Sequence, residues 1–183
     1  MGFISTLLSS LAGSNSFLSG LVNKLVGSGG GGGITYTGAD LPVLMFPVAL
    51  ELPSTKSVLV DARVDITRFV TDQQLVTMIL QEAQASAGLV VDMFIKPQTP
   101  SLSGALRNTL RSSVYLDGND VVIAFMAGSL TVDYAKYLEL PWYAGRIQHY
   151  TTPGTRAPFL QPGVEEGMPF IIGRLVDMIN DVG

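Results

Sequence analysis

Residues 105–128 read ALRNTLRSSVYLDGNDVVIAFMAG and predict two antiparallel strands joined by a tight turn. In the first half, apolar and polar residues alternate, as in a strand with one buried face. The two expected faces are Leu106, Leu110, Val114 and Leu116 on one side, and Arg107, Arg111 and Tyr115 on the other. The sequence DGND at 117–120 is a strong signal for a hairpin turn. The return segment, residues 121–128, is nearly all apolar, which predicts a strand covered on both faces, with a neighbouring subunit as one possible cover.

The clearest helix precedes this hairpin. Thr71 and Gln74 have the spacing of a capping box, and Pro97 is expected to end the helix after Lys96. Its apolar stripe is Val76, Leu80, Ala83, Ala87, Val90 and Phe94, and its polar side carries Gln81, Gln84 and Ser86.

A second helix is expected from Pro162 to the end of the chain, with Pro169 kinking or delaying it because proline lacks a backbone donor. Its stripe is Val164, Met168, Ile171, Leu175, Met178 and Val182. Residues 34–65 contain the short β-favouring runs VLMF, VALEL and SVLVDARVDI. The pattern predicts an α+β fold, in which an antiparallel sheet packs against a long helix and a C-terminal helix, with an extended N-terminal arm.

Three regions follow from this pattern: residues 1–33 as an apolar helical arm with a glycine-rich tether, 34–65 as an extended or β segment, and 66–183 as the α+β core. Residues 27–33, GSGGGGG, are the flexible tether. Apolar residues recur at helical spacing before it: Leu7, Leu8, Leu11, Phe17, Leu18, Leu21, Leu25 and Val26. We expect residues 1–26 to dock on a protein partner rather than insert into a membrane surface, because Lys24 is their single basic residue.

The composition argues against several classes of protein. The chain is 47% hydrophobic and only 14% charged, which predicts apolar surface that meets other subunits. A net charge of −4 argues against a nucleic-acid-binding protein held by phosphate contacts. With no cysteine there is no thiolate nucleophile or Cys-based zinc site.

No constellation of residues predicts catalysis, a metal site or a cofactor. His149 is the only histidine, and no nucleophile motif accompanies it. The adjacent pair Glu165 and Glu166 fits the first turn of a helix, where negative charge is favourable. Asp117 and Asp120 lack the spacing of a calcium loop. We therefore expect no enzyme activity, no cofactor and no bound metal.

Aromatic residues and prolines concentrate in residues 133–162, DYAKYLELPWYAGRIQHYTTPGTRAPFLQP. Tyr, Trp and Arg are enriched at the centres of protein interfaces, so an assembly surface is preferred over a carbohydrate or choline cage. The predicted interface residues are Tyr134, Tyr137, Trp142, Tyr143, Arg146, Tyr150, Phe159 and Leu160. Of these, Phe159 and Leu160 are also expected to fix the start of the last helix.

The order of motifs after residue 97 resembles the head–tail joining (neck, or tail-completion) protein family of long-tailed bacteriophages. The matching residues are Leu102-Ser103-Gly104, Leu106-Arg107, Ser112, Tyr134-Ala135, Tyr137, Glu139 and Pro158-Phe159-Leu160-Gln161-Pro162, and the resemblance covers roughly residues 66–181. Residues 140–155 depart from it, because a longer segment replaces the Gly-Thr that usually follows the glutamate.

The resemblance implies a structural virion protein of the phage neck, assembled in the host cytoplasm. It would form a homo-oligomeric ring, of six or twelve subunits, between a head-completion (stopper) or portal-adaptor protein and a tail terminator or tail tube protein. DNA would pass through the lumen without specific binding. A tail terminator, a peripheral membrane-binding protein acting through residues 1–26, and an enzyme built around His149 remain as alternatives, in that order.

Overall fold

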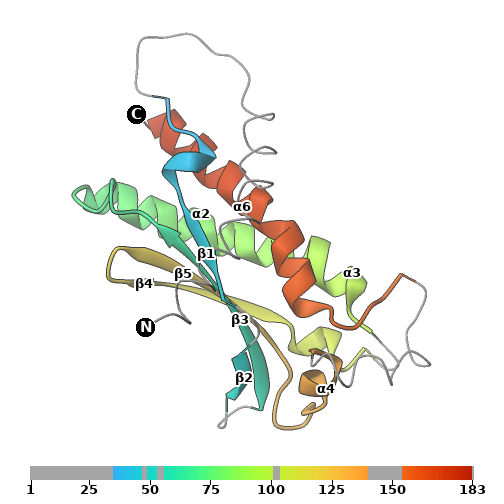
Figure 1. The fold of residues 1–183 in the computed structure, drawn as a ribbon. Helices are drawn as coiled ribbons and strands as arrows, with labels where there is room; N and C mark the ends of the chain where they lie inside the picture. The colour runs from blue at the N-terminus through green and yellow to red at the C-terminus, as the bar shows by residue number, and fades with distance from the viewer. Residues whose placement is uncertain (1–34, 47–48, 53–55, 101–103, 140–153, 183) are drawn as a thin grey trace, which may run out of the picture.

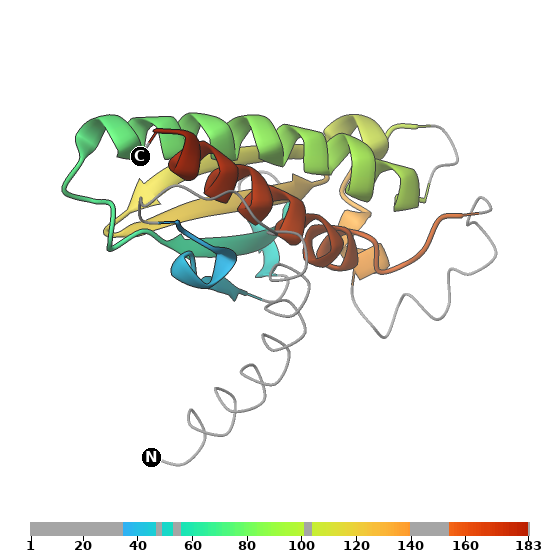
Figure 2. The same ribbon diagram turned by 90° about the horizontal axis from the view of Figure 1, so that it is seen from above.

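The computed structural model describes residues 35–46, 49–52, 56–100, 104–139 and 154–182. The chain has the predicted α+β fold, with two long helices packed on one side of an antiparallel sheet (Figures 1 and 2). The arm and tether of residues 1–33 lie outside the described residues.

The sheet is antiparallel throughout and has the order β1-β3-β5-β4, with β2 also paired to β3. Its strands are β1 (Val43–Met45), β2 (Ala49–Leu52), β3 (Ser57–Asp65), β4 (Arg111–Asp117) and β5 (Asp120–Ala127). The three β-favouring runs before residue 66 thus form β1, β2 and β3, as expected.

The predicted hairpin is confirmed, with Asp117 opposite Asp120 across the two-residue turn. Gly118 has a φ of 63°, which only glycine adopts easily at this position of a tight turn. The first strand is shorter than expected, because residues Arg107–Thr109 form a 3₁₀ turn (η3) and β4 starts at Arg111. Leu106 is buried in the core before the strand, whereas Leu116, near the hairpin turn, is 43% exposed.

The first long helix, α2 (Gln73–Val90), continues through a π-helical turn, η2 (Val91–Ile95), into α3 (Lys96–Gln98). Two expectations about its ends are wrong. Its N-cap is Asp72 rather than Thr71, since Asp72 Oδ1 accepts hydrogen bonds from the N–H groups of Gln74 and Leu75, both at 3.0 Å. The helix also runs past Pro97, which lies in the first turn of α3, where a missing N–H is tolerated.

The buried side of this helix also differs from the expected stripe. Ser86, expected on the polar side, is fully buried, and its hydroxyl donates to Glu82 Oε1 at 3.0 Å. The buried residues from α2 to the end of η2 are Ile79, Ala83, Ser86, Ala87, Val90, Val91 and Ile95. The added residue of a π turn rotates the contact face, which helps to explain why Ile95 replaces Phe94 in the core.

The C-terminal helix α6 (Leu160–Val182) begins two residues before Pro162 and is continuous across Pro169, so the expected delay is wrong. Two glycines allow it to approach α2 and η2 closely. A Cβ on Gly167 would lie 2.4 Å from Val90 Cγ1, and a Cβ on Gly163 would lie 3.0 Å from the Cα of Ile95. A side chain at Gly167 would force Val90 to shift, and one at Gly163 would crowd Ile95.

One core fills the space between the sheet and these helices. It contains the helix-facing residues of β3 and β5: Val58, Val60, Ala62, Val64, Val121, Ile123, Phe125 and Ala127. The short helix α4 (Ala135–Glu139) adds Ala135 and Leu138 at one end. The opposite face of the sheet, which carries the alternate residues, is not covered by any of the described helices (Figure 2).

Candidate interaction surface

Among the described residues, no group of three or more potential metal ligands comes together. The Glu165–Glu166 pair has separate partners. Glu166 accepts from Arg156 Nη2 at 2.6 Å and from Gln98 Nε2 at 2.5 Å, and the Arg156 contact lowers its pKa; Glu165 accepts from Gln161 Nε2 at 2.9 Å. Both carboxylates therefore have structural contacts at the start of α6. His149 lies outside the described residues.

The sheet face opposite α2 and α6, called the outer face here, is rich in apolar side chains. Register places these residues on it: Leu44, Phe46, Leu59, Asp61, Arg63, Arg111, Ser113, Tyr115, Val122, Ala124 and Met126. Leu44, Phe46 and Tyr115 are 41%, 41% and 47% exposed. In contrast, Val122 and Ala124 on the central strand β5 are buried, at 0% and 4%. The outer face thus combines an inaccessible centre with partly exposed apolar flanks.

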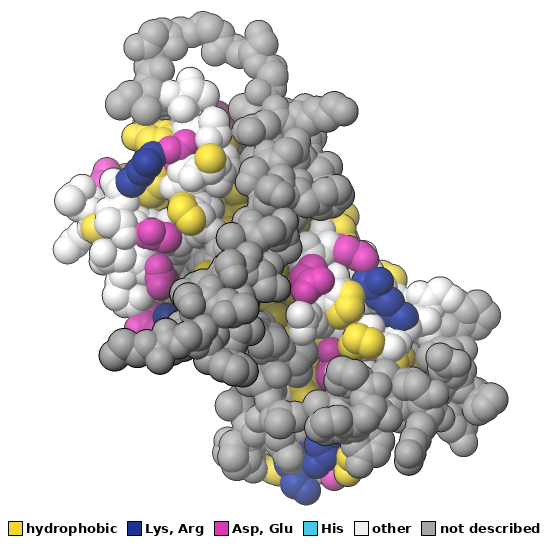
Figure 3. All heavy atoms as spheres, in the orientation of Figure 1, with side chains coloured by type: hydrophobic (Ala, Val, Ile, Leu, Met, Phe, Trp, Pro, Cys, Tyr) yellow, Lys and Arg dark blue, Asp and Glu magenta, His cyan; other side chains and the backbone are white. Residues whose placement is uncertain are grey.

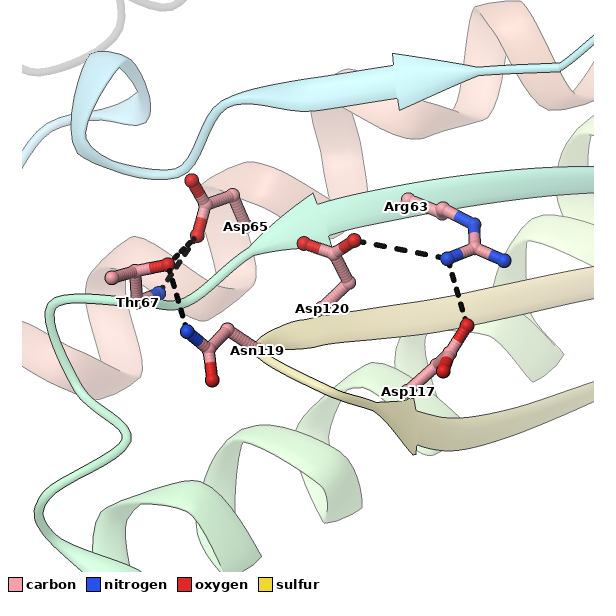
Figure 4. A network of polar contacts seen from close by, with 6 residues as sticks. All are labelled: Arg63, Asp65, Thr67, Asp117, Asn119 and Asp120. Atoms are coloured by element: carbon pink, nitrogen blue, oxygen red, sulfur yellow. Dashed lines mark hydrogen bonds and ion pairs between the residues drawn. The ribbon is translucent and has the colours of Figure 1, made fainter.

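An acidic group borders the outer face at the hairpin end, as Figure 4 shows. Arg63 Nη1 lies 2.8 Å from Asp117 Oδ2 and 3.8 Å from Asp120 Oδ2. In the adjacent part of Figure 4, Asp65 Oδ1 accepts from the backbone N–H and hydroxyl of Thr67, which lowers the pKa of Asp65. One guanidinium therefore faces two carboxylates at the turn, and this corner of the face is net acidic. Asp117 and Asp120 are paired across the hairpin turn.

Two polar atoms on the outer face have no hydrogen-bond partner in the part of the chain that the structure describes. Asp61 Oδ1 and Arg63 Nε are both buried, and neither has a hydrogen-bond partner among the described residues. Burial raises the pKa of Asp61, partly offset by the charge of Arg63. The Arg63 guanidinium lies over the Phe46 ring, 5.6 Å from its centroid. Buried polar atoms normally find a partner, so a group that covers the face can donate a hydrogen bond to Asp61 Oδ1 and accept one from Arg63 Nε–H.

The other end of the outer face is held by Arg111. Its guanidinium donates to the Ser57 hydroxyl at 2.8 Å and to the carbonyls of Thr109 and Gly128, both at 3.1 Å. Ser57 Oγ in turn donates to Gly128 O at 2.9 Å. These bonds span β4, β5 and β3, so Arg111 has a structural role in closing the sheet end.

The predicted interface residues of segment 133–162 fall into three groups. Tyr134 and Tyr137 are 40% and 37% exposed at α4, next to the core, and their contacts with another subunit remain a prediction. Phe159 and Leu160 are fully buried, so their assignment to an intermolecular interface is corrected: both side chains belong to the core of the chain itself. The remaining residues, Trp142, Tyr143, Arg146 and Tyr150, lie outside the described residues.

Glu139 connects α4 to the start of α6. Its Oε1 accepts from the N–H groups of Phe159 and Leu160 at 2.9 and 2.8 Å, and Oε2 is 3.5 Å from Gln161 N. The first N–H groups of a helix have no partner within the helix, so this carboxylate supplies one. Burial raises the pKa of Glu139, although the three N–H groups act in the opposite direction.

Sequence reasoning expected residues 121–128 to be covered on both faces, but it named none of the outer-face residues as interface residues. A signal was present in β3, where the alternation of SVLVDARVD separates Leu59, Asp61 and Arg63 from the core-facing residues.

On the part of the molecular surface visible in Figure 3, acidic and basic side chains are interspersed with apolar ones over the described residues.

One described helix, Gln73–Gln98, is long and apolar enough to cross a membrane by those two measures alone. Such a signal is weak, because the core helix of a soluble protein meets the same criteria. Here the helix contacts α6 and the sheet through Ile79, Ala83, Ala87 and Val90.

Comparison of the chain with protein-family models, with curated proteins and with solved structures found no match.

Proposed function

We propose that this chain is a structural virion protein of the phage neck, which forms a ring between the DNA-filled head and the tail and lines the DNA channel. The observation that carries the proposal is the contact between Glu139 and the N–H groups of Phe159 and Leu160. The glutamate belongs to the YAKYLE motif and its partners to the PFLQP motif, two of the segments on which the resemblance rests. Two motifs separated by twenty residues thus act as one structural unit.

The surface of the sheet supports assembly with other subunits. Leu44, Phe46 and Tyr115 present partly exposed apolar area on the outer face. Apolar and aromatic residues of this kind are typical of the centres of protein interfaces. A protein that acts by forming contacts needs such surfaces rather than a catalytic site.

The charge distribution supports a channel that does not retain DNA. The following ion pairs engage basic side chains: Lys56–Asp133, Arg63–Asp117, Arg68–Asp40, Lys96–Asp92, Arg156–Glu166 and Arg174–Glu82. A phosphate-binding surface needs cations that are available to release counterions from DNA. With these cations paired and a net charge of −4, DNA is expected to pass without specific binding.

The proposed neighbours are a head-completion (stopper) or portal-adaptor protein on one side and a tail terminator or tail tube protein on the other. Trp142 is the residue of choice to test this, because tryptophan is frequent among the residues that dominate binding energy. We expect Trp142→Ala to leave a folded subunit while heads and tails accumulate separately in lysates of the encoding phage. Trp142→Phe, which keeps an aromatic ring, is the matched control and should restore joining. Normal infectious particles from Trp142→Ala would contradict the proposal.

A further inference from the structure

The outer face has the properties of a surface that is occupied. Val122 and Ala124 are almost inaccessible, although α2 and α6 both lie on the other side of the sheet (Figure 2). At the same depth, Asp61 Oδ1 and Arg63 Nε are buried without hydrogen-bond partners among the described residues. An occupant must therefore offer apolar side chains together with small groups that can both donate and accept hydrogen bonds.

We propose that residues 3–26 of the same chain dock as a helix along the outer face, over β3 and β5. This segment contains eight apolar residues at helical spacing and many short polar ones: Ser5, Ser9, Ser10, Ser14, Asn15, Ser16, Ser19 and Asn23. A serine hydroxyl can donate to Asp61 and accept from the N–H of Arg63, and an asparagine amide can do the same. The segment has one charged residue, Lys24, so burying its other residues removes no charge from water.

The dimensions of the arm match those of the face. As a helix, residues 3–26 would be about 36 Å long and 10 Å wide. The nine residues of β3 extend over roughly 30 Å, and two neighbouring strands together are about 10 Å across. One helix would thus cover the strip formed by β3 and β5, where Val122 and Ala124 are buried.

The position where the described chain begins makes docking within one chain feasible. Tyr36 is bonded to Asn180 near the end of α6, and the Pro42 carbonyl accepts from Asp65 N, so the chain reaches the sheet at its β1 edge beside the hairpin end. The seven-residue tether can reach about 15 Å. From β1, the strands β3 and β5 lie one and two spacings away, or about 5 and 10 Å.

The tether also fixes the direction of the arm. Lys24 lies three residues before the tether, so it would be at the end of the face where Asp65, Asp117 and Asp120 gather (Figure 4). Asp117 and Asp120 share the guanidinium of Arg63, and Asp65 is bonded to the uncharged Thr67, so a lysine there would reduce the excess negative charge. The start of the arm would then lie toward Leu59 and Met126.

The absence of cysteine from the chain allows a direct test in the full-length protein. Ser14→Cys, in the middle of the arm, is combined with Tyr115→Cys on the outer face and treated with a short thiol cross-linker. Two controls replace Tyr115 by other exposed positions: Leu89→Cys on α2, 42% exposed, and Val182→Cys, 52% exposed and two residues after Asn180, which bonds Tyr36. Docking predicts cross-linking within one chain that is on the order of ten times faster at Tyr115 than at either control, through a higher effective concentration.

Every other outcome overturns the proposal. Equal rates at the three positions would mean that the arm is not bound to the outer face. Cross-links that form only between chains, at a rate that rises with protein concentration, would show that the arm of a second copy occupies the face. Binding of the full chain to liposomes of mixed neutral and anionic lipids, lost on deletion of residues 1–33, would assign the arm to a membrane surface instead.

Discussion

Glu139 Oε1 accepts a hydrogen bond from Leu160 N at 2.8 Å, and this bond joins the end of α4 to the first residue of α6. The same oxygen accepts from Phe159 N at 2.9 Å. A buried side chain therefore satisfies two N–H groups at the point where the chain enters its C-terminal helix.

Replacing Glu139 tests the contribution of this cap. Glu139→Ala leaves buried N–H donors unpaired, which typically costs about 1–3 kcal/mol of folding free energy. Glu139→Gln keeps an acceptor oxygen at the Oε1 position and should lose less. The midpoint of urea unfolding measures both variants. Equal midpoints for wild type and Glu139→Ala would show that the cap does not stabilise the chain.

The pH dependence of stability should also report on Glu139. Because burial raises its pKa in the folded state, the folded chain binds more protons at this site than the unfolded chain does. The contribution of Glu139 to the unfolding free energy is fully present below its unfolded pKa of about 4.3. It is lost as pH rises through the folded pKa. The unfolding free energy of wild type, measured relative to that of Glu139→Gln, should therefore decrease as pH rises from the unfolded pKa to the folded pKa. A difference that is constant from pH 4 to pH 8 would contradict this.

The crossing of α6 and α2 depends on Gly167. An alanine Cβ there would lie 2.4 Å from Val90 Cγ1, so we expect Gly167→Ala to destabilise the chain by about 1–3 kcal/mol through overpacking. Gly173→Ala on the same helix is the matched control, because its Cβ would meet nothing within 4 Å. That change should stabilise by about 0.4–1 kcal/mol, since alanine restricts the unfolded chain. Thermal unfolding of both variants distinguishes close packing from a general effect of helix propensity.

Combining Gly167→Ala with Val90→Ala extends this test. If the contact between Gly167 and Val90 causes the loss, the double variant should be less destabilised than the sum of the two single changes. If the losses in unfolding free energy of the two single variants simply add, the contact between Gly167 and Val90 is not the cause.

Arg111 should be sensitive to a change that conserves its charge. Lysine cannot reproduce a planar fork that bonds Ser57, Thr109 and Gly128 together, so Arg111→Lys is expected to cost about 1–2 kcal/mol. Arg68→Lys is the control, because Arg68 pairs with Asp40 at an exposed site, and exposed pairs contribute only about 0–1 kcal/mol. Equal losses for the two variants in urea unfolding would count against a special role for Arg111.

The sequence predicted the fold class well because its signals were local. The hairpin depends on the residues of its own turn, and β3 on an alternation that spans nine residues. The core position of Ser86 and the passage of the helix through Pro97 were not predictable in the same way. Ser86 lies on the same face of α2 as Ile79 and Val90, where a polar residue type gave no sign of burial. The helix passes Pro97 directly after the π turn at Val91–Ile95, an irregularity that the periodicity of the sequence does not indicate.

The candidate surface was less accessible to sequence reasoning. Aromatic composition singled out Phe159 and Leu160, but composition cannot distinguish a buried aromatic residue from an interface residue. The outer face required the register between strands, because Leu44, Tyr115 and Val122 are far apart in sequence and adjacent only in the sheet.

The mass of the purified full-length protein in solution tests the central claim most directly. Light scattering behind a sizing column, at two protein concentrations, should give a mass near six or twelve times the 19.5 kDa of one chain, as expected for a closed ring. A mass of one or two chains at both concentrations would contradict a ring that assembles from this protein alone.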